Sequence, residues 1–241
     1  MALVVFDIDG TLTRSTGVDD ECVVRAMRDE VGLSGFDCDW ANYPHATDSG
    51  LTQEIVRRHA GREATAGEQA RVQRRMVELL RQVADREPER FGMVAGATAL
   101  MRRLSEKRGW AVSIATGAWK ASAMIKLRTA GVDAGGYAAA FADDAISRQD
   151  ITLTSVGRAL GVPASRGVLR TARERWGAVV YVGDGVWDAR TSRELGIGFV
   201  GVRVEGDFER LRAEGATRVL REYEDLDAAV AMIQRAVDDG G

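Results

Sequence analysis

Short apolar runs alternate with longer amphipathic stretches along most of the 241-residue chain. The runs are rich in valine, isoleucine and alanine, which is typical of buried strands. They predict strands over residues 3–8, 111–115, 137–141, 178–182 and 197–204. Helical spacing predicts helices over residues 95–107, 119–130, 151–160, 165–176, 186–195 and 225–238. Strands that alternate with helices indicate an α/β fold, with a parallel sheet covered by helices on both faces.

The segment from about residue 15 to residue 90 departs from this alternation. It has no strand-like run, and helical spacing recurs after Asp19, from Thr52 onward and over residues 65–86. The third of these stretches ends just before a proline, which disfavours helix in the residue before it. We therefore predict an α/β core formed by residues 1–15 and 91–241, and a helical insertion formed by residues 16–90.

Composition and charge exclude several classes of protein. The 33 basic and 36 acidic residues give a formal net charge of −3, so nothing favours nucleic acid or an anionic membrane as a partner. Two cysteines, Cys22 and Cys38, form neither a disulfide framework nor a zinc site. No run approaches the ~20 apolar residues of a spanning helix, and the first run is too short for a signal peptide. We expect a cytoplasmic protein, and the sequence does not indicate its oligomeric state.

Two aspartates, Asp7 and Asp9, end the first apolar run in the stretch V-F-D-I-D-G-T-L-T. Residues i and i+2 of a strand point the same way, so we expect both carboxylates at the carboxyl end of the sheet, where open α/β sheets bind ligands. Their mutual repulsion is offset by a cation such as Mg²⁺, which prefers oxygen ligands. Solvated acids at a turn are the alternative, and the D-x-D spacing alone does not decide between the two.

Polar residues also follow later strands. Thr116 and Gly117 follow the strand at 111–115, where a hydroxyl can bind a phosphoryl oxygen or simply cap the next helix. Asp184 and Asp188 follow the strand at 178–182, where two acids can complete a metal shell or balance a helix dipole. Each feature alone has an ordinary structural explanation, and only their combination favours catalysis.

Together, F-D-I-D-G-T-L-T and G-D-G-V-W-D resemble motifs I and IV of the haloacid dehalogenase-like superfamily. The aspartate at position 9 resembles the phosphatase branch, and the insertion resembles the helical C1 cap of phosphoglycolate phosphatase-like members. The resemblance covers residues 4 to about 204. It implies a three-layer Rossmann-like core with an inserted helical cap, Mg²⁺ as cofactor, and hydrolysis of a small phosphorylated metabolite through an aspartyl-phosphate.

The resemblance also implies roles for individual residues. Asp7 is expected to be the nucleophile, and Asp9 the general acid and base. Thr116 is expected to hold phosphoryl oxygens, and Gly117 lets the backbone approach the substrate. The metal ion is expected to contact the Asp7 carboxylate, the Asp9 backbone carbonyl and Asp184.

In the same way, Asp188 is expected to steady the metal shell from one helical turn beyond Asp184. The family usually has a lysine as its third motif, and here Arg148, at the start of a helix, stands in its place. Arginine can neutralise a phosphoryl group through a fork of N–H donors. Lys120 is the alternative. In the predicted cap, the loop 39–50 contains Thr47 and Asp48, which either reach the substrate or pack the loop against its own helices.

Three classes of function are compatible with these motifs to different degrees. A phosphatase releases the phosphoryl group to water, whereas a phosphomutase returns it to the substrate, and these motifs do not separate the two. A non-enzymatic phospho-acceptor module is the third class, but such domains are shorter and carry no cap. The sequence does not identify one substrate.

Overall fold

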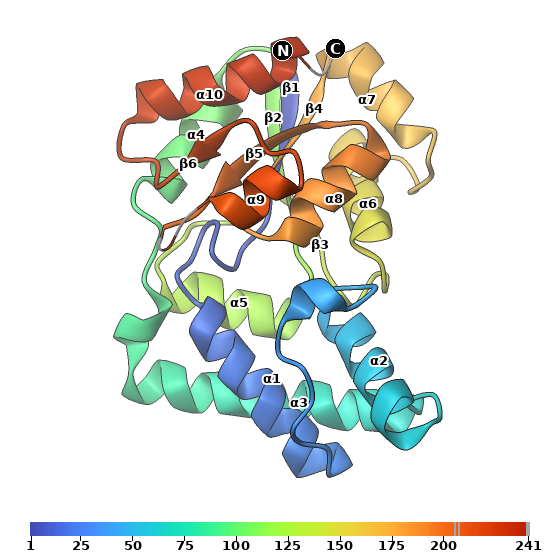
Figure 1. The fold of residues 1–241 in the computed structure, drawn as a ribbon. Coiled ribbons are helices and arrows are strands. Elements are labelled where there is room, and N and C mark those ends of the chain that lie inside the picture. The colour runs from blue at the N-terminus through green and yellow to red at the C-terminus, as the bar shows by residue number, and fades with distance from the viewer. Residues whose placement is uncertain (205, 207, 240–241) are drawn as a thin grey trace.

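A computed structural model describes residues 1–204, 206 and 208–239, so the last two residues of the predicted core lie outside the described residues. Its centre is one sheet of parallel strands in the order β3-β2-β1-β4-β5-β6 (Figure 1). The strands are β1 (Ala2–Phe6), β2 (Trp110–Ala115), β3 (Ala138–Ala140), β4 (Val179–Gly183), β5 (Gly198–Val202) and β6 (Val219–Leu220). The predicted parallel sheet is confirmed, and the fold is the Rossmann-like α/β fold that the sequence indicates.

Helices cover both faces of this sheet, as predicted (Figure 1). One face is covered by α4 and α10, and the other by α6, α7 and α8. The helices and 3-10 turns are α1 (Thr16–Val31), η1 (Trp40–Asn42), α2 (Asp48–Ala60), α3 (Ala66–Arg86), η2 (Pro88–Phe91), α4 (Ala97–Glu106), α5 (Lys120–Thr129), α6 (Arg148–Leu160), α7 (Val168–Trp176), α8 (Val186–Leu195), α9 (Glu209–Ala213) and α10 (Leu226–Asp239). Within the described residues, the short α9 and the two 3-10 turns have no counterpart in the pattern of the sequence.

Strand β1 is buried along its whole length because it lies in the middle of the sheet. Leu3 and Val5 point to the side covered by α6 and α7, whereas Val4 and Phe6 point to the side covered by α4 and α10. A strand buried on both faces reads as a continuous apolar run. This is why the first run of the sequence shows no alternation of polar and apolar residues.

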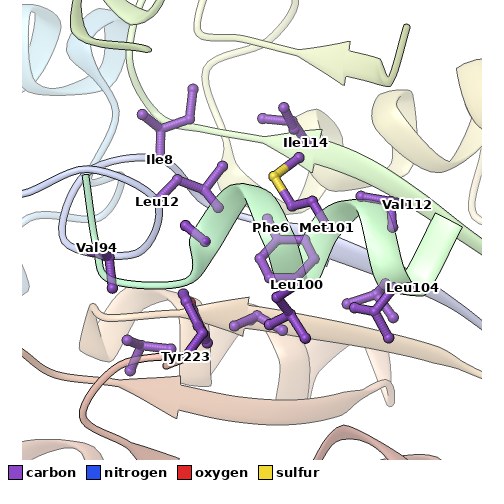
Figure 2. Close-up of a cluster of buried hydrophobic side chains, with 14 of the residues drawn as sticks. Phe6, Ile8, Leu12, Val94, Leu100, Met101, Leu104, Val112, Ile114 and Tyr223 are labelled. Atoms are coloured by element: carbon purple, nitrogen blue, oxygen red, sulfur yellow. The ribbon is translucent and has the colours of Figure 1, made fainter. Parts of the chain in front are cut away.

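The C-terminal part of the chain packs onto the loop after β1. The rings of Phe6 and Tyr223 meet edge to face with their centroids 6.4 Å apart (Figure 2). The Tyr223 hydroxyl then donates a hydrogen bond of 3.1 Å to the backbone oxygen of Thr11. The loop that holds Asp7 and Asp9 is therefore fixed by contacts with a residue more than 200 positions away.

Between β1 and β2, the described chain forms helices and no strand, as expected for residues 16–90. Helix α3 packs against α1 and also against α5 (Figure 1). Thr65 and Glu68 form a capping box at the start of α3, near the predicted boundary of this helix. These helices share an apolar cluster that includes Val18, Met27, Ile55, Val72, Met76 and Leu80. The division of the chain into a core and a cap at residues 16 and 90 remains a prediction.

Helix α2 begins earlier than the sequence suggests. The prediction opened it near Thr52, whereas the structure begins it at Asp48. The reason is local, because the Thr47 side chain accepts a hydrogen bond of 3.1 Å from the backbone N–H of Gly50 and so caps the helix. The end of the predicted loop 39–50 is therefore the first turn of a helix. None of the described helices is both long enough and apolar enough to cross a membrane.

Candidate active site

The carboxyl ends of the parallel strands meet at the edge of the sheet that faces α1 and α2 (Figure 1). Asp7 follows β1, Thr116 follows β2, and Asp184 follows β4. A cavity of about 60 Å³ lies at this edge. Most of the predicted site residues line it, namely Asp7, Asp9, Thr47, Asp48, Gly117, Arg148 and Asp184. The fold thus brings together residues from both sides of the helical insertion.

Three carboxylates gather at one side of this cavity. Oxygen atoms of Asp7, Asp184 and Asp188 all lie within 4.8 Å of one another. Burial raises the pKa of Asp7, raises that of Asp184 well above its usual range, and raises that of Asp188 to about 7. The buried Oδ1 atoms of Asp7 and Asp188 accept no hydrogen bond from the described residues, and their partner is the Arg148 guanidinium, 3.0 Å from each. A hard divalent cation fits this set of oxygen ligands, since it would offset their charge.

Arg148 is the cation closest to the nucleophile candidate. Its Nη1 atom lies 3.0 Å from Oδ1 of Asp7 and 3.0 Å from Oδ1 of Asp188, although its N–H is directed at the Tyr181 hydroxyl, 3.3 Å away. The guanidinium is buried, and Asp7 and Asp188 raise its pKa although burial opposes the charged form. Lys120, the alternative from the sequence, is exposed at the start of α5. The structure therefore places Arg148 against Asp7.

Two glycines let other groups approach the site closely. Gly10 has a φ of +70°, and a β-carbon there would lie 2.0 Å from Oδ2 of Asp184. A β-carbon at Gly117 would lie 2.6 Å from the backbone oxygen of Ala46 and 2.8 Å from Nη2 of Arg148. Only glycine has no side chain to clash at such positions. Gly10 therefore makes room for a metal-ligand candidate, and Gly117 makes room for the segment that enters α2.

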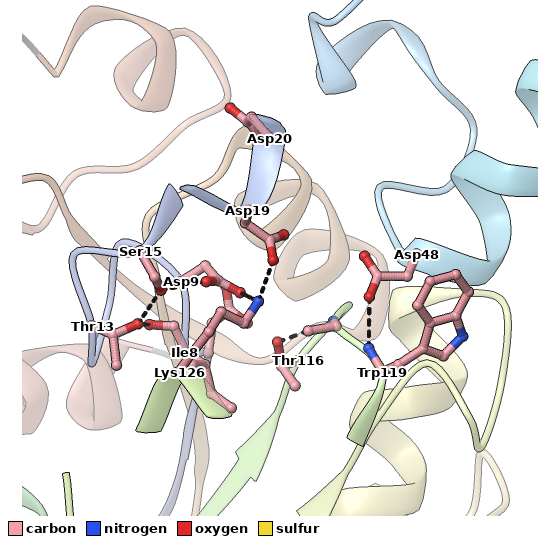
Figure 3. A network of polar contacts seen from close by, with 12 residues as sticks. Ile8, Asp9, Thr13, Ser15, Asp19, Asp20, Asp48, Thr116, Trp119 and Lys126 are labelled. Carbon is pink, nitrogen blue, oxygen red and sulfur yellow. Dashed lines mark hydrogen bonds and ion pairs between the residues drawn. The ribbon is translucent and has the colours of Figure 1, made fainter. Parts of the chain in front are cut away.

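The carboxylates of Asp7 and Asp9 line the same cavity but do not share their partners, so the expectation of a common direction is only partly met. Strand β1 ends at Phe6, and the two-residue period of a strand does not extend into the turn that follows. The Asp9 carboxylate accepts hydrogen bonds from Ser15 Oγ at 2.6 Å and from Lys126 Nζ at 2.5 Å (Figure 3). Its side chain thus lies outside the cluster of three carboxylates.

Lys126 is the residue that sequence reasoning missed. It is fully buried in α5, and its ammonium group also donates to Oδ1 of Asp19 at 2.7 Å (Figure 3). Burial disfavours the charged form, but Asp19 and Asp9 raise the pKa of Lys126 above its usual value. Two signals could have found it: it is one of only three lysines among 33 basic residues, and it stands beside the apolar Leu127 in a helix.

Thr116 lies beneath the cavity rather than in its lining. Its side-chain oxygen accepts a hydrogen bond of 3.3 Å from the backbone N–H of Ala118 (Figure 3). Its own N–H donates to the backbone oxygen of Ala140 at 3.2 Å. The hydroxyl still has a proton to donate, so its predicted role toward a phosphoryl oxygen stays a prediction.

The residues at the start of α2 connect the insertion to the rest of the protein. Thr47 Oγ1 donates to the backbone oxygen of Ile146 at 2.7 Å, and Asp48 Oδ2 accepts from the backbone N–H of Trp119 at 2.7 Å. Burial raises the pKa of Asp48 to about 6. Both proposed substrate contacts therefore also hold the segment against the ends of β2 and β3, and their role in binding stays a prediction.

Most of the sequence matches one family of known enzymes. Residues 1–196 match the family model described as haloacid dehalogenase-like hydrolase. The chain belongs to the haloacid dehalogenase-like hydrolases. Asp7, Asp184 and Asp188, with Arg148 beside them, form the polar centre of this family member. The resemblance inferred from the motifs is thereby confirmed.

Solved structures share the fold of this haloacid dehalogenase-like hydrolase. A hydrolase from Pseudomonas syringae is 20% identical with a TM-score of 0.70, and the match covers 97% of this chain and 99% of that one. A putative beta-phosphoglucomutase from Bacteroides vulgatus is 16% identical with a TM-score of 0.67, covering 98% and 90%. A predicted phosphoglycolate phosphatase from Haemophilus somnus 129pt is 14% identical with a TM-score of 0.58, covering 95% and 97%. No curated protein matches the chain.

Proposed function

We propose that this haloacid dehalogenase-like hydrolase is a Mg²⁺-dependent phosphatase that hydrolyses a small phosphomonoester through an aspartyl-phosphate on Asp7. The observation that carries the proposal is the position of Asp7. It is buried at the end of β1, near Asp184 and Asp188, and 3.0 Å from Arg148. A carboxylate with a cation and further oxygen ligands around it suits attack on a phosphorus atom.

In the first half of the reaction, a carboxylate oxygen of Asp7 forms a bond to phosphorus and the bond to the leaving oxygen breaks. Asp9 donates a proton to that oxygen, so the substrate leaves as an alcohol. Arg148 balances the negative charge on the transferring group, because it remains cationic beside Asp7.

In the second half, a water molecule attacks phosphorus and gives its proton to Asp9, and the bond from phosphorus to Asp7 breaks. Inorganic phosphate leaves, and both aspartates return to their first state. A Mg²⁺ ion held by Asp7, the Asp9 backbone carbonyl and Asp184, with Asp188 beside them, would supply positive charge that favours an anionic substrate next to an anionic nucleophile. The close approach of the Asp7, Asp184 and Asp188 oxygens to one another supports this fit.

A phosphomutase is the alternative for the same site, because it would use the same aspartyl-phosphate and return the phosphoryl group to a substrate. The fold is shared with a putative beta-phosphoglucomutase, which at 16% identity shows the fold alone. The fate of the phosphoryl group separates the two activities. A phosphatase releases it to water at every turnover, whereas a mutase retains it until a sugar phosphate or similar acceptor arrives.

The test is the release of inorganic phosphate from p-nitrophenyl phosphate, measured with Mg²⁺ and with a chelator. Wild type is compared with Asp7→Asn and with Asp85→Asn, a matched control at an exposed position in α3. Metal-dependent release that Asp7→Asn abolishes and Asp85→Asn retains would support the proposal. Activity that survives Asp7→Asn would refute it. Acid-quenched protein that carries a long-lived phosphoryl group on Asp7, without steady release, would favour the mutase.

A further inference from the structure

Lys126 lies behind the cavity and not in it. Its side chain has 0% exposure, and it is absent from the residues that line the cavity. Its Nζ atom joins two carboxylates that come from different parts of the chain, Asp9 after β1 and Asp19 in α1 (Figure 3). A group in this place cannot touch a substrate, but it directly contacts the proposed general acid.

Both oxygens of the Asp9 carboxylate have a fixed partner. Ser15 Oγ donates to Oδ1 at 2.6 Å, and Lys126 Nζ donates to Oδ2 at 2.5 Å. Ser15 is itself buried and lies 2.5 Å from the Thr13 hydroxyl. Because both donors are buried and cannot move freely, they fix the orientation of the Asp9 carboxylate through each of its two oxygens.

Stability alone does not account for a lysine at this position. A buried ion pair is often no more stabilising than well-packed apolar residues of similar volume, because both ions lose their hydration. Ala123 and Leu127, which neighbour Lys126 in α5, are buried apolar residues, whereas the Lys126 ammonium group lies between the carboxylates of Asp9 and Asp19. The ammonium group of Lys126 donates a hydrogen bond to the Asp9 carboxylate, which an apolar side chain could not do.

We propose that Lys126 is a positioning residue that, with Ser15, aims the Asp9 carboxylate at the leaving oxygen. The proposal rests on the phosphatase reaction proposed above. During cleavage the bond between Asp7 and phosphorus forms, the bond from phosphorus to the leaving oxygen breaks, and the proton of that step comes from Asp9. The proton leaves Oδ2 of Asp9 for the leaving oxygen and Oδ2 becomes negatively charged, while Lys126 keeps all its protons and its hydrogen bonds to Asp9 and Asp19.

The proposal predicts an effect that depends on the leaving group. An alkoxide must be protonated as it leaves, whereas p-nitrophenolate leaves without help. The experiment therefore measures kcat/KM for 2-hydroxyethyl phosphate and for p-nitrophenyl phosphate. Lys126→Met is expected to lower the value for the alkyl ester by about 10- to 100-fold and that for the aryl ester by less than about 3-fold. Lys126→Arg, which keeps the charge, is expected to restore part of the loss.

Two further variants make the result specific. Lys107→Met changes an exposed lysine at the end of α4 and is expected to leave both kcat/KM values unchanged. Ser15→Ala removes only a hydroxyl from the other side of Asp9, so it tests the same idea if Lys126→Met does not fold. It is expected to give a smaller loss with the same preference for the alkyl ester.

The outcomes that overturn the proposal are distinct. Equal losses on both esters, or no loss, in Lys126→Met and Ser15→Ala would show that these residues do not position Asp9. An additional loss on the alkyl ester when Lys126→Met is added to Asp9→Asn would also overturn it, since a positioning residue has no effect once its target is gone. A wild-type protein that releases phosphate from neither ester would instead overturn the proposed function, and this proposal with it.

Discussion

Replacing Gly10 with alanine tests whether the position of the Asp184 carboxylate depends on the absence of a side chain in the turn after β1. Gly10 has a φ of +70°, where alanine costs about 1–2 kcal/mol of the free energy of unfolding. The new β-carbon would also lie 2.0 Å from Oδ2 of Asp184, so that carboxylate must move. Overpacking of this kind costs a further ~1–3 kcal/mol.

Gly131 provides a matched control for the backbone cost. Its φ is also +70°, but a β-carbon there would have nothing within 4 Å. Gly131→Ala is therefore expected to cost about 1–2 kcal/mol and to leave the carboxylates of the site in place. For a chain of this size, each kcal/mol lowers Tm by roughly 2–4 °C.

Thermal unfolding with Mg²⁺ and with a chelator separates the two effects. At a concentration 100 times its Kd, an ion that binds only the folded state adds about 2.7 kcal/mol to the free energy of unfolding. This raises Tm by roughly 5–11 °C. Wild type and Gly131→Ala are expected to show this shift, and Gly10→Ala is expected to lose most of it because Asp184 is displaced. The reasoning is refuted if Gly10→Ala keeps the full shift, or if Gly131→Ala loses it.

Three other predictions concern charge in the site. The raised pKa of Asp188, about 7 against 3.8, gives stability that is present below pH 4 and lost as the pH rises through 7. Tm of the metal-free protein is therefore expected to fall from pH 5 to pH 8, and the gain from Mg²⁺ to be larger at pH 8; equal gains would contradict this. In urea unfolding at pH 8 without metal, Arg148→Met is expected to lower the free energy of unfolding by about 3–5 kcal/mol, and Arg148→Lys by less than half of that. The reason is that only Arg148→Met leaves the Asp7 carboxylate unpaired. Equal losses in the two variants would argue against the ion pairs. Six aspartates and a single arginine are the charged residues that line the cavity in the described part of the chain. Phosphoglycolate, which adds a carboxylate to the phosphate, is therefore expected to show a kcat/KM at least ~10-fold below that of 2-hydroxyethyl phosphate, whose organic part is uncharged. A preference for phosphoglycolate would contradict the electrostatic argument.

Much of the site could be predicted because its residues follow strands. In a parallel sheet all strands end at the same edge, and Asp7 and Asp184 meet there because β1 and β4 are neighbouring strands. Arg148 could be found in the same way, since it begins the helix that follows β3. These inferences depend on strand direction, which the alternation of strands and helices indicates, whereas the order that makes β1 and β4 neighbours comes from the structure.

What the sequence by itself determined is the parallel sheet, the helical segment after the first strand, and the cluster of acids at the strand ends, because these depend on local periodicity. Only the tertiary structure decided the partners of Asp9. Lys126 is 117 positions from Asp9 and 107 from Asp19, and although it is one of only three lysines, nothing in the local sequence connects it to either aspartate. The packing of α5 near α1 buries its ammonium group between two carboxylates, and a buried charge must be paired. That contact depends on how two helices pack, which local periodicity does not encode.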